Sequence, residues 1–306
     1  MQRQCLITNS IDNMTASQSR FFAHFLQLNL AMLCISTSGV LGRYIDLPIP
    51  ITIGLRALLA SLILFSFCKW KQLGFNIQQK DRRTVLISGL LLGIHWITYF
   101  YALKLSNVAI GMLSLFTYPV LTAILEPIIR KTKILKFHLF LGCWVLVGIY
   151  FLVPDFDLAS NTLQAVGFGT LSALSYSFRN IFMAEKVKQY NGIVLMTYQL
   201  FVIAVALSPF FFIMDSTRLV AYLPATLALA LITTSIGHTL FLYSFRHFST
   251  ATASIISCTQ PIYGILLGML FLQEYPEPST LIGGTIIIIT VFAESFRVYK
   301  QGKSTV

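Results

Sequence analysis

Long apolar stretches separated by short polar segments dominate the chain. A bilayer core of about 30 Å needs roughly 20 mostly apolar residues per helix, and ten stretches meet that need. We expect membrane-spanning helices near residues 25–45, 49–69, 84–103, 107–129, 136–153, 163–184, 192–214, 222–244, 249–272 and 279–297. Most of the breaks between them contain proline or small polar and acidic residues, which end helices.

The composition agrees with a membrane protein. Hydrophobic residues make up 56% of the 306 positions and charged residues only 11%, less than half of the roughly 25% typical of soluble domains. A net charge of +11 could suggest nucleic acid as a partner. A nucleic-acid-binding surface gathers Lys and Arg beside polar sequence, however, and here they lie in short clusters between apolar stretches, so we expect no nucleic-acid partner.

The basic clusters predict the orientation, because short cytoplasmic loops carry an excess of Lys and Arg. With the N-terminus inside, most of the 22 Lys and Arg residues fall in cytoplasmic segments. Arg43, Lys104 and Arg218 fall in outer ones, and Arg56 and Arg179 lie inside predicted spans. The fold class predicted is therefore all-α integral membrane, with both termini cytoplasmic.

The two ends of the chain and its cysteines add little chemistry. Residues 1–23 are predicted to be a cytoplasmic tail rather than a signal peptide, since they lack a short apolar core followed by a cleavage site. Residues 299–306 are predicted to be a second cytoplasmic tail. The five cysteines are scattered without CxxC spacing, so we expect no disulfide framework, no metal site and no cofactor.

The second half of the chain repeats the first. "TYPVLTAILEP" from Thr117 is echoed by "TQPIYGILLGM" from Thr259, and the shift of 142 residues is the difference between positions 119 and 261. The same shift aligns the following pairs: Tyr101 with Tyr243, Lys104 with Arg246, Ala109 with Ala251, Pro119 with Pro261, and Gly142 with Gly284. Chance agreement between apolar helices is the competing explanation, and the conserved spacing of so many residue types argues against it.

Each repeat contains five spans, which is an odd number, so the second repeat must enter the membrane from the opposite side. The expected architecture is ten transmembrane helices as two inverted five-helix repeats. Inverted repeats are the construction of many secondary transporters, in which the two halves rock against each other around a central site.

These residues also carry a resemblance to a known family. Arg56, "YALKLSNVAIGMLSLFTYP" from Tyr101 and "YSFRHFSTATASIISCTQPIYGILLGMLFLQEYPEPSTLIGG" from Tyr243 resemble the ten-helix form of the drug/metabolite transporter superfamily, with two EamA repeats. The resemblance covers about residues 24–298 and implies a first repeat at 24–153 and a second at 154–298. One departure is that Glu274 follows the family pattern, whereas the corresponding position of the first repeat is Thr132.

Ionisable groups inside the predicted spans are the first candidates for function, because each costs at least ~2.5 kcal/mol to insert. Arg56 and Arg179 could hold a carboxylate or phosphate through a bidentate fork. The structural alternatives are a tie from Arg56 to helix-end carbonyls or to Asp46, and snorkelling of Arg179 to the cytoplasmic side past Glu185.

Two histidines and one glutamate are candidates for proton coupling. His95 and His238 lie centrally in spans at nearly equivalent positions of the repeat, and histidine exchanges protons near neutral pH. A backbone hydrogen bond is the alternative for either ring. Glu126 could also couple protons, although a carboxylate one turn from Arg130 usually pairs with it.

The repeated prolines, Pro119 and Pro261, are expected to break their helices in mid-membrane, where a cavity can satisfy the freed carbonyls. The side chains next to them, together with aromatic and polar residues of other spans, then form the predicted solute site. The candidate contacts are Arg56, His95, Trp96, Tyr99, Tyr101, Thr117, Tyr118, Tyr176, Arg179, Asn180, Tyr198, Gln199, His238, Tyr243, Thr259 and Gln260.

The predicted function is a secondary transporter that moves a small polar metabolite by alternating access, with amino acids or related compounds favoured. Efflux is favoured by the family resemblance alone. An enzyme is not expected, because neither HExxH nor GxSxG occurs, and without a P-loop the chain has no sign of ATP-driven pumping. A lipid flippase and a non-transporting membrane scaffold are the alternatives.

The expected partners are a small-molecule solute and the lipid bilayer, and the protein is expected to be a monomer or homodimer. The location favoured is the bacterial inner membrane as a multi-pass protein. A eukaryotic organelle stays open.

Overall fold

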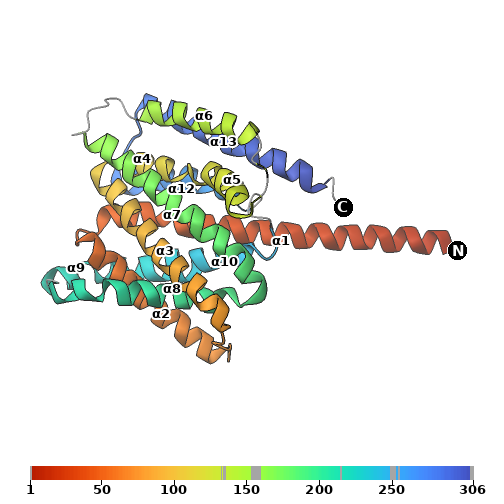
Figure 1. The fold of residues 1–306 in the computed structure, drawn as a ribbon, viewed down its shortest axis with the longest axis horizontal. Coiled ribbons are helices and arrows are strands. Elements are labelled where there is room, and N and C mark those ends of the chain that lie inside the picture. Colours follow the sequence, from red (N-terminus) through yellow and green to blue (C-terminus); the bar gives the residue numbers. More distant parts are fainter. Residues whose placement is uncertain are drawn as a thin grey trace.

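Helices joined by short turns make up the part of the chain that the structure describes, and no strand occurs in it. The structure is a computed structural model that describes residues 2–131, 133, 136–152, 160–213, 216–248, 253 and 256–303. Figure 1 shows a bundle with most helices running roughly along its long axis.

The first half contains six helices. They are α1 (Gln2–Tyr44), α2 (Ile49–Trp70), α3 (Gln79–Leu105), α4 (Val108–Leu115), α5 (Tyr118–Ile129) and α6 (Lys136–Leu152). Helices α4 and α5 together cover the predicted fourth span, and the break between them falls at Phe116 and Thr117. Pro119 lies in the first turn of α5, where its missing N–H costs nothing.

The second half follows the same plan. It contains α7 (Asn161–Gln189), α8 (Gly192–Leu207), η1 (Ser208–Ile213), α9 (Ser216–Ala228), η2 (Leu229–His238), α10 (Thr239–Ser244), α12 (Thr259–Leu272) and α13 (Pro278–Lys303). Helices α9, η2 and α10 form one continuous rod, and Pro261 lies in the first turn of α12 as Pro119 does in α5. Much of the predicted span 249–272 before α12, and the predicted turn at 153–159, fall outside the described residues.

Six helical segments among the described residues are long and apolar enough to cross a membrane. They are 23–44, 49–70, 79–105, 108–129, 192–212 and 217–244. Shorter apolar helices occupy 140–152, 259–272 and 278–290. Helix α7 is 29 residues long and buries several polar side chains, including Ser172, Arg179 and Asn180.

The packing of the helices follows the repeat. Helix α3 packs along α7, and η2, which is the equivalent of α3 in the second half, packs along α1. Helix α7 also packs on α4 and α5, and in the same way α1 packs on α12. The pairs α2 with α8 and α6 with α13 each join equivalent helices of the two halves. This is the pattern that a pseudo-two-fold axis between the halves produces.

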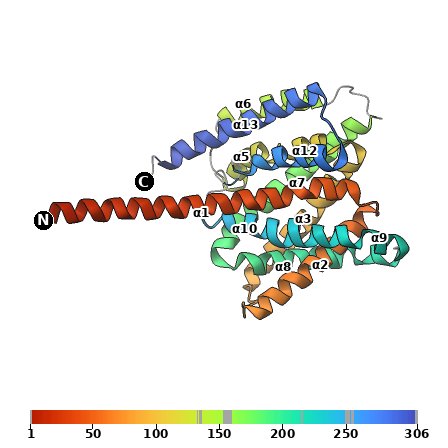
Figure 2. The ribbon, with the colours of Figure 1, turned by 180° about the vertical axis from the view of Figure 1, so that it is seen from behind.

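Both termini lie at the same end of the bundle, which we call the terminal end; the opposite end is the far end (Figures 1 and 2). Helix α1 continues without a break from the predicted span back to Gln2. Its N-terminal part projects beyond the other helices at the terminal end (Figure 2). The first residues are therefore helical, which their polar sequence did not suggest.

Candidate functional site

A small cavity lies where the two halves meet. Its wall is formed by Ile35, Ser38, Arg56, His95, Trp96, Tyr99, Leu115, Phe116, Tyr118, Tyr176, His238 and Gln260. The space open to the centre of a water-sized molecule is about 10 Å³, which holds about one water. In this structure the cavity is therefore too small for a solute much larger than water.

Arg56 is the charged residue of this wall and is completely buried. Its guanidinium carbon lies 3.8 Å from the centroid of the Trp96 ring, so the planar group is stacked on the indole. Its Nε donates to the Thr234 hydroxyl at 2.6 Å. Both terminal nitrogens of the guanidinium are without a hydrogen-bond partner among the residues that the structure describes. The predicted alternatives, helix-end carbonyls and Asp46, are not the partners of Arg56 in this structure.

Within the described part of the chain, three more polar atoms of the wall are buried without a hydrogen-bond partner. They are the indole nitrogen of Trp96, the hydroxyl of Tyr99 beside Ser38, and Nδ1 of His238. Buried polar groups in native structures are nearly always paired, and leaving one unpaired costs about 1–3 kcal/mol. Their concentration around one cavity marks a place where a ligand can supply the missing acceptors.

His95 is held by a serine of the other half. The Ser172 hydroxyl donates its hydrogen to the His95 carbonyl at 2.8 Å and lies 2.7 Å from His95 Nδ1. Because a hydroxyl has one hydrogen, this arrangement makes Nδ1 the donor to the Ser172 oxygen. The ring also stacks on Tyr176, with centroids 4.3 Å apart.

The second buried arginine lies in a different environment. Arg179 is also completely buried, but its Nε donates to the Gln199 amide oxygen at 2.8 Å and one terminal nitrogen to the Asn180 amide oxygen at 3.1 Å. The other terminal nitrogen contacts the Met196 sulfur at 3.7 Å. Arg179 does not snorkel out past Glu185, and each of its three guanidinium nitrogens has a partner inside the second half.

Several predicted site residues lie away from the cavity wall. The hydroxyls of Thr117 and Thr259 donate to carbonyls three residues earlier in their own chain segments. Tyr198 donates to the Phe75 carbonyl, and Tyr243 packs beneath Arg246. Glu126 pairs with Arg130 at 3.0 Å, as the structural alternative expected. Tyr101 stacks on Phe168 and is partly exposed.

The structure also identifies a hydrogen-bond partner of Arg56, Thr234, that was not predicted from the sequence. Thr234 lies in η2, a π-helical segment in which its hydroxyl donates to the Leu229 carbonyl five residues earlier. Such segments are often found at functional sites. The polar run Thr233, Thr234 and Ser235, one turn before His238, was the signal in the sequence.

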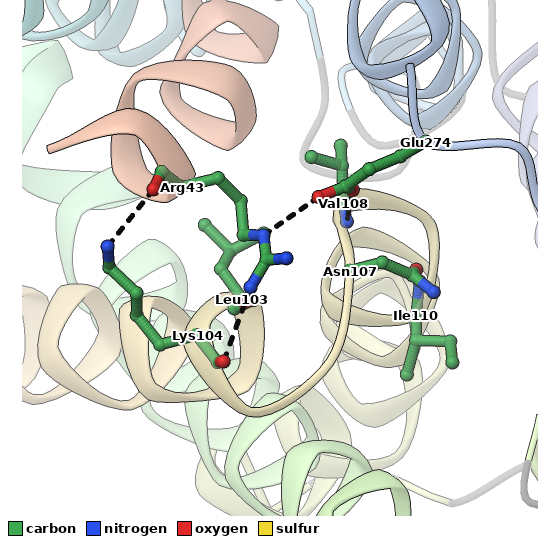
Figure 3. Close-up of polar contacts among 7 residues, drawn as sticks. All are labelled: Arg43, Leu103, Lys104, Asn107, Val108, Ile110 and Glu274. Carbon is green, nitrogen blue, oxygen red and sulfur yellow. Dashed lines mark hydrogen bonds and ion pairs between the residues drawn. The ribbon is translucent and has the colours of Figure 1, made fainter. Parts of the chain in front are cut away.

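A network of polar contacts at the far end of the bundle is drawn in Figure 3. Arg43, at the end of α1, donates to Glu274 at 2.8 Å and to the Leu103 and Lys104 carbonyls. Lys104 donates back to the Arg43 carbonyl at 3.0 Å. The other carboxylate oxygen of Glu274 accepts the Val108 N–H at 2.8 Å. This network joins α1, α3, α4 and the turn after α12.

A second set of polar contacts lies at the terminal end. Arg246, after α10, donates to the Val187 and Tyr190 carbonyls at the end of α7, both at 2.9 Å. Asp81, in the first turn of α3, accepts from Lys186 and from the Tyr190 hydroxyl, each at 2.7 Å. Because the Tyr190 hydroxyl donates its hydrogen bond to the Asp81 carboxylate, the phenol loses its proton less readily and the pKa of Tyr190 is raised.

Comparison with known proteins places this arrangement in a family. The sequence profile of the EamA-like transporter family matches twice, over residues 24–153 and 163–295. The chain is 24% identical to the pseudopaline exporter CntI of Pseudomonas aeruginosa over 280 residues, which cover 87% of this chain and 94% of that protein. It is 24% identical over 283 residues to the uncharacterized inner membrane transporter YicL of Salmonella typhimurium, covering 87% of this chain and 92% of that one.

A solved crystal structure shares the fold. It has 16% sequence identity and a TM-score of 0.67, covering 91% of this chain and 98% of that one. The two profile matches correspond to the two halves that meet at the cavity. The chain therefore belongs to the EamA-like transporter family of the drug/metabolite transporter superfamily, and it is an integral, multi-pass membrane transporter.

Proposed function

We propose that this protein is a secondary transporter that moves a small polar metabolite, with amino acids or related compounds the favoured class, by alternating access. The observation that carries the proposal is a closed cavity between two halves of like packing, with a separate polar network at each end. Alternating access needs one site and two gates that open in turn.

The two gates correspond to each other under the repeat. Lys104 binds a carbonyl at the C-terminal end of α1, and Arg246 binds carbonyls at the C-terminal end of α7. Positions 104 and 246 are related by the 142-residue shift, and α1 and α7 are the first helices of the two halves. The same contact at opposite ends supports ten transmembrane helices in two inverted repeats.

The orientation follows from the charges and the termini. Both termini lie at the terminal end (Figure 1), which suits an even number of crossings. The positive-inside rule makes this end cytoplasmic. The protein is placed in the bacterial inner membrane, a location that the name of the Salmonella relative states for that protein. Efflux is supported by the name of the Pseudomonas relative, an exporter.

The solute contacts proposed are the predicted site residues that line the cavity. They are Arg56, His95, Trp96, Tyr99, Tyr118, Tyr176, His238 and Gln260. Arg179, Asn180 and Gln199 are not among the residues that line the cavity. Proton coupling is assigned to His95 and His238, whose rings reach the cavity, rather than to Glu126.

Counterflow into proteoliposomes tests the proposal. Vesicles preloaded with one unlabelled amino acid are given the labelled compound outside, and the panel of amino acids is run compound by compound. A transporter produces a transient accumulation that protein-free vesicles lack. Fluorescent-headgroup phospholipids are assayed in the same vesicles. A flippase moves only the lipids, and a scaffold moves neither, so either result contradicts the proposal.

A further inference from the structure

The unpaired atoms of the central cavity define the chemistry of its ligand. We infer that the cavity binds the carboxylate of an organic acid through the free edge of Arg56, and that it discriminates against a positively charged group on the same molecule. This inference rests on the proposed transport function; within the class of small polar metabolites it favours acids that lack an amine over the amino acids themselves.

The orientation of Arg56 decides which edge is available. Its Nε is used by Thr234, and its face is covered by Trp96. The pair of terminal nitrogens is what remains, and both are buried and unpaired. Two parallel N–H groups on a fixed plane match the two oxygens of a carboxylate, which they bind as a fork.

The other unpaired atoms complete the match. The Trp96 indole nitrogen can only donate, and the Tyr99 hydroxyl can donate as well. A carboxylate has two oxygens with about four acceptor positions, so it can satisfy the Arg56 edge and further donors together. A neutral hydroxyl or amine cannot accept from so many donors.

The charge of the surroundings argues against cations. Of the described residues, no Asp or Glu lines the cavity, and the buried acid among them is Asp81, which is paired with Lys186 at the terminal end. An ammonium group in the cavity would face Arg56 without a carboxylate to balance it. Because charges interact strongly where water is excluded, the protein favours an acid without a free amine over its amino-acid analogue.

Aromatic rings form much of the rest of the wall. Trp96, Tyr99, Phe116, Tyr118 and Tyr176 all reach the cavity. Such walls hold an apolar or flat body next to the carboxylate anchor. The ligand expected is a small organic acid with an apolar body, and the cavity must expand to admit it.

Thermal shift assays of the detergent-purified full chain with matched ligands test the inference. Each series keeps one apolar body and changes only the charged groups. The phenyl series is 3-phenylpropionate, phenylalanine and 2-phenylethylamine; the isobutyl series is 4-methylpentanoate, leucine and isopentylamine; the short series is propionate, alanine and ethylamine. We expect the acid to give the largest shift in at least one series, about 3 °C at tenfold excess over its Kd, the amino acid a smaller one and the amine none. Stabilisation by an amine, or by no acid in any series, would overturn the inference.

Two arginine variants separate binding from folding. Arg56→Gln is expected to abolish the shift with the acid while the ligand-free protein melts no lower than the wild type, because an incompletely paired buried charge is removed. Arg179→Gln is the matched control: it leaves Gln199 and Asn180 without their partner, so it should lower the melting temperature and keep the relative shift. Arg56→Lys keeps the charge but loses the fork, so it should retain only part of the shift. An acid-dependent shift that survives in Arg56→Gln contradicts the inference.

The same variants in proteoliposomes distinguish this inference from the proposed function. If an amine or a neutral solute is transported and its flux does not depend on Arg56, the proposed transport function stands and the proposed carboxylate site is wrong. Arg56-dependent binding of the acid without any flux would keep the site and remove the proposed transport.

Discussion

Lys104 and Arg246 occupy equivalent positions in the two halves and make equivalent contacts at opposite ends of the molecule. Lys104 donates to the Arg43 carbonyl at the end of α1 at 3.0 Å. Arg246 donates to the Val187 and Tyr190 carbonyls at the end of α7 at 2.9 Å. A cation at a helix C-terminus satisfies carbonyls that have no partner within the helix and interacts favourably with the helix dipole.

Replacing either cation should loosen one end and leave the other intact. Lys104→Ala is expected to raise backbone hydrogen exchange at the far end of α1, and Arg246→Ala at the terminal end of α7. Each contact is worth about 1 kcal/mol, so a roughly fivefold increase in exchange rate is expected. Hydrogen–deuterium exchange read by mass spectrometry measures both ends in one experiment. Equal loosening of both ends by either variant would contradict separate gates.

Glu274 is expected to contribute more to stability than a surface carboxylate, because it serves both Arg43 and the Val108 N–H (Figure 3). Glu274→Ala should destabilise the protein by about 1–2 kcal/mol, since it leaves the Val108 N–H and the Nε of the half-buried Arg43 without their partner. Glu126→Ala is the control, as its pair with Arg130 is more exposed, and about 0–0.5 kcal/mol is expected. Melting curves of the two variants in the same detergent measure the loss of stability in each. Equal losses would show that the network at the far end adds no stability beyond that of an exposed ion pair.

The contact between α6 and α13 depends on two glycines. A Cβ at Gly283 would lie 2.5 Å from the Gly148 carbonyl oxygen, which real contacts do not allow. Gly283→Ala should therefore force the helices apart and cost about 1–3 kcal/mol. Gly167→Ala, where a Cβ meets nothing within 4 Å, should be neutral or stabilise slightly. A Gly283→Ala protein that melts like the wild type would argue against this close packing in the membrane protein.

The terminal-end network predicts a specific effect of Asp81→Asn. The amide cannot balance the charge of Lys186, and it accepts more weakly than a carboxylate from the Tyr190 hydroxyl. We expect a lower melting temperature and faster hydrogen exchange at the end of α7, in the direction of Arg246→Ala. The double variant Asp81→Asn/Arg246→Ala should lower the melting temperature by less than the sum of the two single effects, because both changes loosen the same segment. Full additivity would show that the two contacts act independently.

Hydropathy was sufficient to predict where the helices lie, because each span must hide its backbone in the bilayer. The predicted range 163–184 became α7 at 161–189, and the prolines predicted the break between α4 and α5. The helical form of residues 2–22 was missed because polar sequence gives no span signal. The π-helical turn at η2 was missed because its five-residue hydrogen bonds leave no periodicity in hydropathy.

The sequence predicted the candidate site residues as a group, but it could not predict which of them line the cavity. Arg56 and Arg179 look alike in sequence, since each is one arginine within an apolar span. Their difference comes from neighbours on other helices: Gln199 pairs with Arg179, whereas Thr234 is the hydrogen-bond partner that Arg56 has among the described residues. Tyr198 illustrates the same limit, because the face of α8 on which it lies points to Phe75 and away from the cavity.

The central claim is that the cavity opens to each side of the membrane in turn. Ser38 lines it from α1 and is buried, so Ser38→Cys in a chain whose five cysteines have been replaced provides one reporter. A membrane-impermeant maleimide is added to right-side-out and, separately, to inside-out vesicles. We expect labelling from both sides, each reaching most of the protein with time, and slower labelling with a transported solute present. Labelling from only one side, with the full reaction appearing after denaturation, would contradict alternating access.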